Sequence, residues 1–446
     1  MEILVKLGQM ILMLSILVTL HELGHFIPAK YFKTKVEKFY LFFDPWFSIF
    51  KKKIGETTYG IGWLPMGGYV KIAGMIDESM DTDQMKSEPK PWEFRSKPAW
   101  QRLIIMLGGI TVNVLLAWLI YAIMFTTNGI SYLSLDKAQA QNGLEFSQLG
   151  KEIGFQDGDK IISVDGKKQD NFRRLTLDVM LSEEIVVDRN GENVKLRIKD
   201  EQIKEILSKE GRDNFVYPKT EGIIVGQIVP GQDAEKAGLK SGDKILAFSG
   251  QPVNVFTVQE TLEKFKNSDV NLTVERNNRK ELVKLSVPDS AKIGIGFGAN
   301  IPESMVVHKE FNFFSAIPEA IKESFTILNY NIKNLKLIIK PKTEAYKQVA
   351  GPIGIARQLP STWDWNFFWS FTAMFSMWLA FVNLLPIPGL DGGHALFTIA
   401  EMVTGRTLGD KAMGIVQTIG MVILLSLMAL IFGKDIYDWI MDKFVF

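Results

Sequence analysis

Apolar residues along this chain gather into four long stretches that are separated by charged segments. The clearest stretch, Leu103–Thr126, contains no charged residue and is long enough to cross a bilayer as a helix. Similar stretches open the chain and recur in its last third, so we expect transmembrane helices at about 4–27, 101–127, 367–385 and 412–432. The segment Asn312–Lys340 is amphipathic and charged, which predicts a helix at the membrane interface or on the soluble part.

The first apolar stretch is expected to be retained as a membrane helix. A signal peptide would end in a small-residue cleavage site, and none follows this stretch. The apolar run continues instead into the polar sequence of His21–His25, which therefore lies near the end of a membrane helix.

Basic residues around the four stretches predict their orientation, because cytoplasmic loops of membrane proteins are enriched in Lys and Arg. Only Lys6 precedes the polar end of the first stretch, whereas seven lysines follow it before residue 60. Residues 28–99 and 386–411 are thus expected in the cytoplasm, with both termini and the large middle segment on the other side. The seven lysines are Lys30, Lys33, Lys35, Lys38, Lys51, Lys52 and Lys53.

The charged middle segment contains an internal repeat. Gly154–Ile162 reappears as Gly238–Leu246, and a Gly-rich turn leading into an alternating strand predicts two small β-rich domains. We therefore expect five parts along the chain. They are a membrane part at 1–128, β-rich domains at 129–215 and 220–288, a connecting region at 289–365 and a second membrane part at 366–446.

Composition narrows the chemistry. The 446 residues include 51 Lys and Arg against 50 Asp and Glu, a balance that gives no sign of nucleic-acid binding. The chain has no cysteine, which excludes disulfides and thiolate metal sites. Any metal site must therefore use carboxylates and the four histidines, which are His21, His25, His308 and His394.

The sequence His21-Glu22-Leu23-Gly24-His25 is the H-E-x-x-H pattern of zinc peptidases. Residues four apart project from one face of a helix, so His21 and His25 are expected to bind one zinc ion. Glu22 is placed to take a proton from water at the metal and to pass it to the leaving amine. The pattern also occurs by chance on soluble helices, but ionisable residues within a membrane helix are costly and usually functional.

A catalytic zinc needs a third protein ligand, and the best candidate follows the third apolar stretch. Residues 383–394 contain two prolines and three glycines, which break the helix at membrane depth, where such backbone normally lines a cavity. Asp391 is the ligand candidate in this segment and His394 is its rival. The alternative for Asp391 is an ordinary helix N-cap.

These two motifs, in this order on these stretches, resemble the site-2 protease family of intramembrane zinc metalloproteases. Two tandem β-rich domains between the second and third helices are similar to its regulator-of-sigma-E branch. The resemblance implies that His21, His25 and Asp391 bind one zinc per chain and that Glu22 is the catalytic base. It implies a supporting role for His394.

The β-rich repeats and the segment Trp63–Lys71 add to the resemblance. The second repeat, AGLKSGDKILAFSGQPV, resembles a PDZ domain, with Ile223–Gly226 as candidate carboxylate-binding strand. The first repeat lacks the usual Ala-Gly, which favours a spacer or steric cover. Trp63–Lys71 resembles a re-entrant β-hairpin at about 57–74, whose edge at Gly67 and Gly68 would pair with an extended substrate.

Two asparagines are further substrate-binding candidates. Asn383 resembles a family position that contacts the substrate backbone, and its alternative is a helix-end cap. Asn113, after the small residues Gly108 and Gly109, is equally explained by a hydrogen bond between helices. The segment Gly351–Ile355 also matches the family pattern, and it is expected to be a structural turn.

The fold class expected overall is a polytopic α-helical membrane protein with a re-entrant β-hairpin and two inserted PDZ domains. The resemblance implies a bacterial inner-membrane enzyme with periplasmic PDZ domains and an active site near the cytoplasmic side. Implied substrates are single-pass membrane proteins, namely an anti-sigma factor already cut by another protease and remnant signal peptides. Two alternatives are a non-catalytic PDZ scaffold with a structural zinc and a transporter, since intramembrane carboxylates also mark ion paths.

Overall fold

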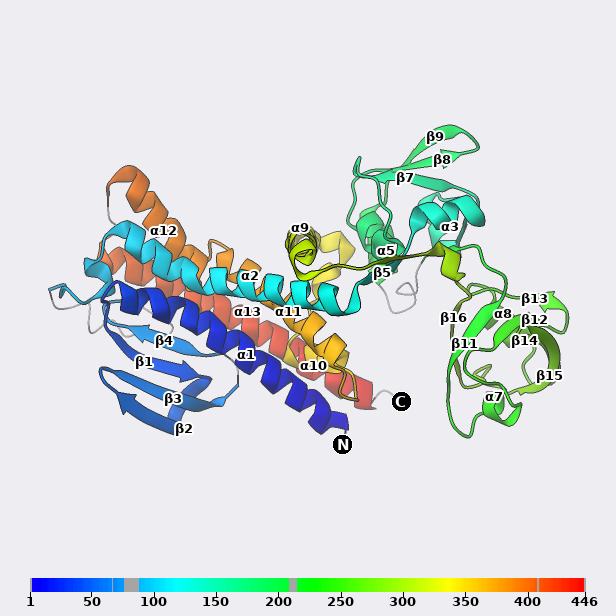
Figure 1. Ribbon diagram of the computed structural model, residues 1–446, viewed down its shortest axis with the longest axis horizontal. Helices are drawn as coiled ribbons and strands as arrows, with labels where there is room; N and C mark the ends of the chain where they lie inside the picture. The colour runs from blue at the N-terminus through cyan, green and yellow to red at the C-terminus, as the bar shows by residue number, and fades with distance from the viewer. Residues whose placement is uncertain (1, 66, 76–87, 208–214, 407–408, 445–446) are drawn as a thin grey trace. The chain divides into compact units, whose positions relative to one another are not determined.

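The chain divides into two compact units (Figure 1). A computed structural model describes residues 2–65, 67–75, 88–207, 215–406 and 409–444. We call the first the helical unit, formed by Met1–Gly129, Glu310–Lys336 and Lys347–Phe446. We call the second the β-rich unit, formed by Ile130–Lys309 and Leu337–Tyr346.

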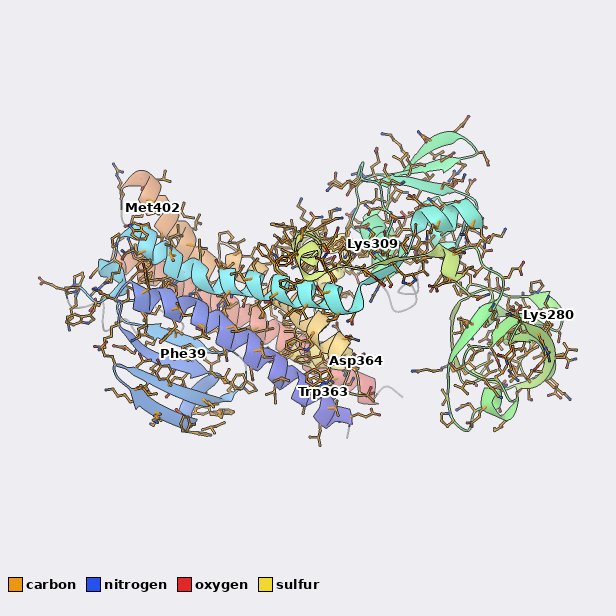
Figure 2. The ribbon with its side chains drawn as sticks, viewed as in Figure 1. Phe39, Lys280, Lys309, Trp363, Asp364 and Met402 are labelled. Atoms are coloured by element: carbon orange, nitrogen blue, oxygen red, sulfur yellow. The ribbon has the colours of Figure 1, made fainter. Side chains whose placement is uncertain are left out.

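In the part of the chain that is described, four helices are long and apolar enough to cross a membrane. They correspond to the four apolar stretches of the sequence, and all belong to the helical unit. Asp364, just before the third of them, accepts hydrogen bonds from the backbone N–H groups of Asn366 and Phe367 and caps that helix (Figure 2). The four helices are α1 (Glu2–Tyr31), α2 (Ala99–Asn128), α11 (Trp365–Leu384) and α13 (Asp410–Phe444).

Glycines bring α1 and α2 into close contact. A Cβ atom on Gly24 would collide with the backbone of Gly108, and one on Gly109 would collide with the rings of His21 and His25. Small residues are what allows helix backbones to approach this closely. The contact therefore fixes the polar end of α1 directly against α2.

The remaining helices of this unit are α9 (Phe313–Ile339), α10 (Pro352–Gln358) and α12 (Asp391–Thr404). The expected amphipathic helix is α9, which carries charged residues along its length and is not one of the four candidate membrane spans. Its Ala316 and Ala320 are buried with Ala117 of α2 and Ala373 of α11. The helix is thus packed on the helical unit along one face.

A four-stranded sheet follows α1 and has the order β2-β3-β1-β4. The prediction of a hairpin at residues 57–74 is wrong in its pairing, because β3 runs parallel to β1 and β4 antiparallel to it. Alternation and the glycine pair located strands and a turn, but local sequence does not reveal which strand lies between them. The strands are β1 (Val36–Leu41), β2 (Phe43–Ile54), β3 (Thr57–Leu64) and β4 (Tyr69–Ile72).

The β-rich unit contains two separate hydrophobic cores, one for each repeat. The first core also includes Met305, Leu337 and Ala345, so the connecting region contributes to the first domain. Its elements are β5 (Ile130–Leu133), α3 (Leu135–Gln141), β6 (Leu144–Phe146), α4 (Gln148–Ile153), β7 (Lys160–Val164), α5 (Phe172–Met180), β8 (Ile185–Arg189), β9 (Glu192–Leu196), α6 (Asp200–Leu207), β10 (Val216–Pro218) and β17 (Val306–Lys309).

The second domain extends beyond residue 288, because its sheet includes a strand at Ile295–Ala299. The candidate carboxylate-binding strand is misplaced, since β11 lies between β12 and β16 and has no open edge at Ile223–Val225. The outer edge on this side belongs to β16. The elements are β11 (Ile223–Ile228), α7 (Asp233–Lys236), β12 (Lys244–Phe248), β13 (Gln251–Pro252), α8 (Val258–Lys264), β14 (Ser268–Arg276), β15 (Arg279–Val287) and β16 (Ile295–Ala299).

The two repeats share a buried ion pair that explains their common Gly-Asp motif. In the second domain, Arg276 donates two hydrogen bonds to Asp243, at 2.8 and 2.7 Å, and a third to the Gly238 carbonyl at 2.9 Å. In the first domain, Arg189 makes the same three bonds to Asp159 and to the Gly154 carbonyl. Each aspartate therefore ties its turn to a distant strand.

Replacing Asp243 by Asn should destabilise the second domain by about 2 kcal/mol, because a charged hydrogen-bonded partner is removed from Arg276. Burial opposes ionisation of Asp243, but Arg276 and the Lys240 amide outweigh it and hold the pKa of this carboxyl below its ordinary value. The stabilisation is therefore present above about pH 4 and is lost as pH falls through the lowered pKa.

Hydrogen exchange of residues 223–299 in the full chain, followed by mass spectrometry, measures the Asp243 effect. Asp269→Asn is the matched control, because it removes an exposed carboxylate that pairs with Lys284 in the same domain. Exposed pairs contribute little, so this variant should exchange like the wild type. Equal exchange in both variants would show that the buried pair does not stabilise the domain.

Candidate metal centre

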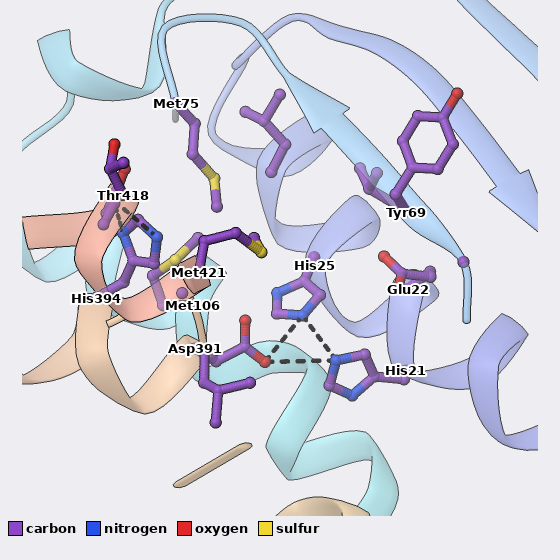
Figure 3. A pocket seen from close by; sticks show the side chains of 16 residues that line it. His21, Glu22, His25, Tyr69, Met75, Met106, Asp391, His394, Thr418 and Met421 are labelled. Carbon is purple, nitrogen blue, oxygen red and sulfur yellow. Dashed lines mark hydrogen bonds and ion pairs between the residues drawn. The ribbon is translucent and has the colours of Figure 1, made fainter. Parts of the chain in front are cut away.

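The polar end of α1 presents two histidines to the inside of the helical unit (Figure 3). His21 and His25 are four residues apart on one helix face, and their Nε2 atoms lie 3.3 Å from each other. The ring of His25 is buried and that of His21 is largely so. Two basic nitrogens are therefore held side by side at the depth of a membrane helix.

Asp391 completes this group from the start of α12. Its Oδ2 atom lies 3.4 Å from His21 Nε2 and 3.3 Å from His25 Nε2. The alternative role as helix N-cap does not hold, because Leu390 occupies that position and no side chain caps the helix. Within the described residues, this is the one group of three His, Asp or Glu side chains close enough to share an ion.

The three donor atoms fit a zinc ion. Tetrahedral zinc with bonds of about 2.0–2.1 Å separates its ligand atoms by about 3.3–3.4 Å. The three measured separations of 3.3, 3.3 and 3.4 Å match one face of such a tetrahedron. Asp391 Oδ2 is buried and accepts no hydrogen bond from the described chain, as expected of an atom reserved for a cation.

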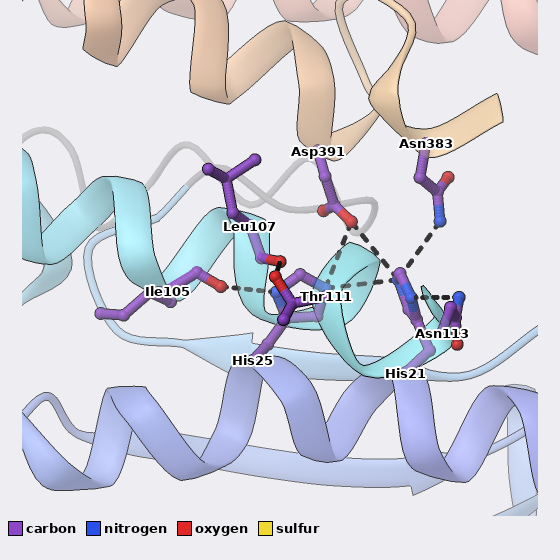
Figure 4. A network of polar contacts seen from close by, with 8 residues as sticks. All are labelled: His21, His25, Ile105, Leu107, Thr111, Asn113, Asn383 and Asp391. Carbon is purple, nitrogen blue, oxygen red and sulfur yellow. Dashed lines mark hydrogen bonds and ion pairs between the residues drawn. The ribbon is translucent and has the colours of Figure 1, made fainter. Parts of the chain in front are cut away.

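Neighbouring groups orient the two rings (Figure 4). The Ile105 carbonyl lies 2.8 Å from His25 Nδ1, so this nitrogen carries the proton and Nε2 keeps its lone pair. The Asn113 amide lies 3.0 Å from His21 Nδ1, and its buried Oδ1 atom has no partner among the described residues. Turning the amide over would place Oδ1 opposite His21 Nδ1, where it would accept a hydrogen bond and fix the same tautomer on His21.

Two glycines shape the loop that delivers Asp391. A Cβ on Gly392 would collide with the backbone at Leu384, and one on Gly393 would collide with that of Ile387. The loop can therefore fold back against the end of α11 only without side chains at these positions. On that helix, Asn383 directs its amide to within 3.3 Å of His21 Nε2.

Glu22 faces a cavity that the three donors share. Its carboxylate lies near the backbone of Val70 on β4, an edge strand of the sheet. Gly68 also lines the cavity, whereas Gly67 adopts a φ of +147° and lies against Phe43. The lining residues are His21, Glu22, His25, Gly68, Tyr69, Val70, Ile72, Met75, Met106, Gly389, Leu390, Asp391, His394, Gln417, Thr418 and Met421.

Comparison with known proteins decides the family. Residues 9–427 match the model of Peptidase family M50. The chain belongs to this peptidase family. A "Putative zinc metalloprotease" of Xylella fastidiosa is 29% identical over 96% of this chain and 97% of its own length. The "Regulator of sigma-E protease RseP" of Escherichia coli is 26% identical over 96% of this chain and 98% of its own length.

At the level of the family, the predictions of a metalloprotease and of a zinc cofactor are confirmed. The transporter alternative is wrong, because the matched family is a family of peptidases. Membership in M50 also agrees with the four apolar helices, and the chain is an integral membrane protein.

In this M50 peptidase, the rival ligand His394 lies apart from the donor group. Both of its ring nitrogens face the Gln417 amide of α13, at 2.9 and 3.2 Å, although the ring lines the same cavity. Sequence reasoning missed Gln417 and the backbone groups of Val70 and Ile105. Backbone groups leave no signal in a sequence, whereas Gln417 and the adjacent Thr418 are polar residues within an apolar stretch, and this is a signal that could have pointed to them.

Proposed function

We propose that this M50 peptidase is an intramembrane zinc endopeptidase that hydrolyses peptide bonds within or near the transmembrane segment of single-pass proteins. The observation that carries the proposal is the donor triangle of His21, His25 and Asp391, which shares one cavity with Glu22. The group stands on helices that are long and apolar enough to span a membrane or directly beside them. A peptide bond cut here would lie within the bilayer or at its surface.

His21, His25 and Asp391 would hold the zinc ion. Zinc in such a site acts as a Lewis acid toward a carbonyl oxygen and makes a water molecule more acidic. The Glu22 carboxylate would accept the proton of the attacking water and return it to the leaving amine. Glu22 and Val70 both line the cavity, so the carboxylate stands beside β4 and next to His21.

The edge strand β4 is the proposed docking place of the substrate. A transmembrane helix hides its peptide bonds, so it must be extended before it can be cut, and an extended peptide can add to the open side of β4. Gly68 lies where β4 meets the cavity, and a Cβ there would collide with Val18. We assign Gly67 and Gly68 to this docking, Asn383 to the substrate backbone and Asn113 to orienting His21.

The two β-rich domains would act as PDZ domains that exclude substrates with bulky outer domains. We place them in the periplasm and the active site near the cytoplasmic side of a bacterial inner membrane. The name of the Escherichia coli relative supports an anti-sigma factor as substrate. Remnant signal peptides are a second proposed class, since they are also single apolar segments.

Purified enzyme in detergent is expected to cleave a model single-span substrate and to contain about one zinc per chain. Dialysis against a chelator should remove the ion and reduce cleavage by at least about 100-fold, and added zinc should restore it. Metal analysis and product quantification on the same samples check both points.

The same measurement separates the peptidase from a PDZ scaffold with a structural zinc. The scaffold predicts bound zinc and no cleavage of any single-span substrate by the wild type. It also predicts a fourth protein ligand, whereas the group in the described part of the chain has three.

A further inference from the structure

Strand β2 carries a row of exposed apolar side chains. Trp46 is 90% exposed, Ile49 66% and Phe47 59%, and Phe50 continues the row. Trp46 and Phe47 each stack on Trp63 of the neighbouring strand β3. So many exposed apolar side chains on one strand are unusual where a strand meets water, and they indicate contact with another apolar phase.

The place of β2 in the protein indicates which apolar phase its exposed side chains contact. β2 is the edge strand opposite β4, and only β4 of the two packs on α1, a candidate membrane span. Figure 1 shows β2 as the strand farthest from the helices of this unit. The sheet belongs to the unit that contains the four candidate membrane spans, so the bilayer is the apolar phase available to the exposed row.

Three consecutive lysines follow the apolar row on the same strand. Lys51, Lys52 and Lys53 are all exposed, and none forms an ion pair with another residue that the structure describes. Their partners on the neighbouring strand β3 are the uncharged residues Gly60, Tyr59 and Thr58. Successive side chains of a strand point to opposite faces, so Lys51 and Lys53 share one face and Lys52 stands on the other. Charges of one sign on both faces would be stabilised by an anionic partner.

The spacing fits one leaflet of a bilayer. A strand rises about 3.3 Å per residue, so Phe47 and Lys52 are up to about 16 Å apart. Half of the hydrocarbon core of a bilayer is about 15 Å thick. With the tryptophans among the acyl chains, the lysines would lie at the level of the headgroups.

We propose that Lys51, Lys52 and Lys53 bind the headgroups of anionic phospholipids and hold the sheet at a fixed depth. Each lysine near an anionic surface strengthens binding by about fivefold. The position of β2 in the bilayer affects the cavity through Asp44 of β2. This residue accepts hydrogen bonds from Ser48 and from the Tyr69 hydroxyl, at 2.9 and 2.8 Å. Tyr69 lines the cavity beside Glu22, so lipid bound at one edge of the sheet positions the opposite edge.

The absence of cysteine allows a single probe to report on this contact. An Ile49→Cys variant, labelled with an environment-sensitive fluorophore, would be placed in nanodiscs of phosphatidylcholine with increasing phosphatidylglycerol. We expect a saturable change in fluorescence as the anionic lipid increases. With Lys51, Lys52 and Lys53 all changed to Gln, half-saturation should require at least about tenfold more anionic lipid, and high salt should weaken the wild-type response.

The matched control changes Lys199, Lys280 and Lys292 to Gln, which removes the same charge from exposed positions of the β-rich unit (Lys280 in Figure 2). This control should respond like the wild type, and equal zinc content in all variants shows that the helical unit is intact. An unchanged response in the Lys51–Lys53 variant, or an equal response to phosphatidylcholine alone, would overturn the proposal. The readout does not require cleavage, so it stays informative if the proposed peptidase activity fails.

Discussion

The variant Glu22→Gln is expected to bind zinc as the wild type does and to lose cleavage by about 10²–10⁴-fold. Glutamine keeps the shape of the side chain but cannot accept the proton of the attacking water. The three donor atoms come from other residues, so the metal content should not change. The amide has nearly the same shape beside Val70 as the carboxylate, so β4 should keep its position.

Cleavage of the single-span substrate and zinc per chain would be measured together on the purified variant. Glu56→Gln is the matched control, because this exposed carboxylate stands in the turn between β2 and β3, outside the cavity lining. It should cleave at the wild-type rate. Full activity of Glu22→Gln would remove the assigned base, and loss of its zinc would show instead that Glu22 helps to hold the metal.

The two histidine ligands could be predicted from sequence because their spacing within one helix is a local feature of the chain. His21 and His25 are brought together by the period of one helix, and the chain around them is apolar enough to fix that helix in a membrane. Asp391 is remote, yet the prolines before it and the glycines on both sides of it mark a broken helix at membrane depth. The structure brings this residue to the two histidines as expected.

The sheet shows where local information ends. Alternation identifies Thr57–Leu64 and Tyr69–Ile72 as strands, but not that β1 lies between them. The same limit applies to β11, whose sequence suits an edge strand although β16 covers its open side. Strand neighbours are set by contacts between residues far apart in the chain, which a pattern along one segment does not contain.

The repeat also has a part that sequence comparison missed. Gly154 and Asp159 align with Gly238 and Asp243 at a constant offset, whereas the arginines that bind them lie beyond the repeated stretch. Arg189 and Arg276 sit at the ends of strands and are separated by three residues more than the aspartates. The ion pair is therefore visible only once the strands are in place.

The second large effect is expected from replacing the third zinc ligand, Asp391. Asp391→Asn should reduce zinc affinity by at least about 100-fold and abolish cleavage at ordinary zinc concentrations, because the replacement removes the anionic donor facing both histidines. His394→Asn should keep about one zinc per chain, since both ring nitrogens of His394 face Gln417 and not the donor group.

Zinc titration with a competing chelator would give the affinity of each variant, alongside the cleavage rate. The pair is informative because both residues line one cavity and stand three positions apart on the same helix, so general damage to α12 should affect both alike. Loss of zinc from His394→Asn with retention in Asp391→Asn would reverse the assignment. Retention in both would mean that the two histidines of α1 hold the ion without a ligand from α12.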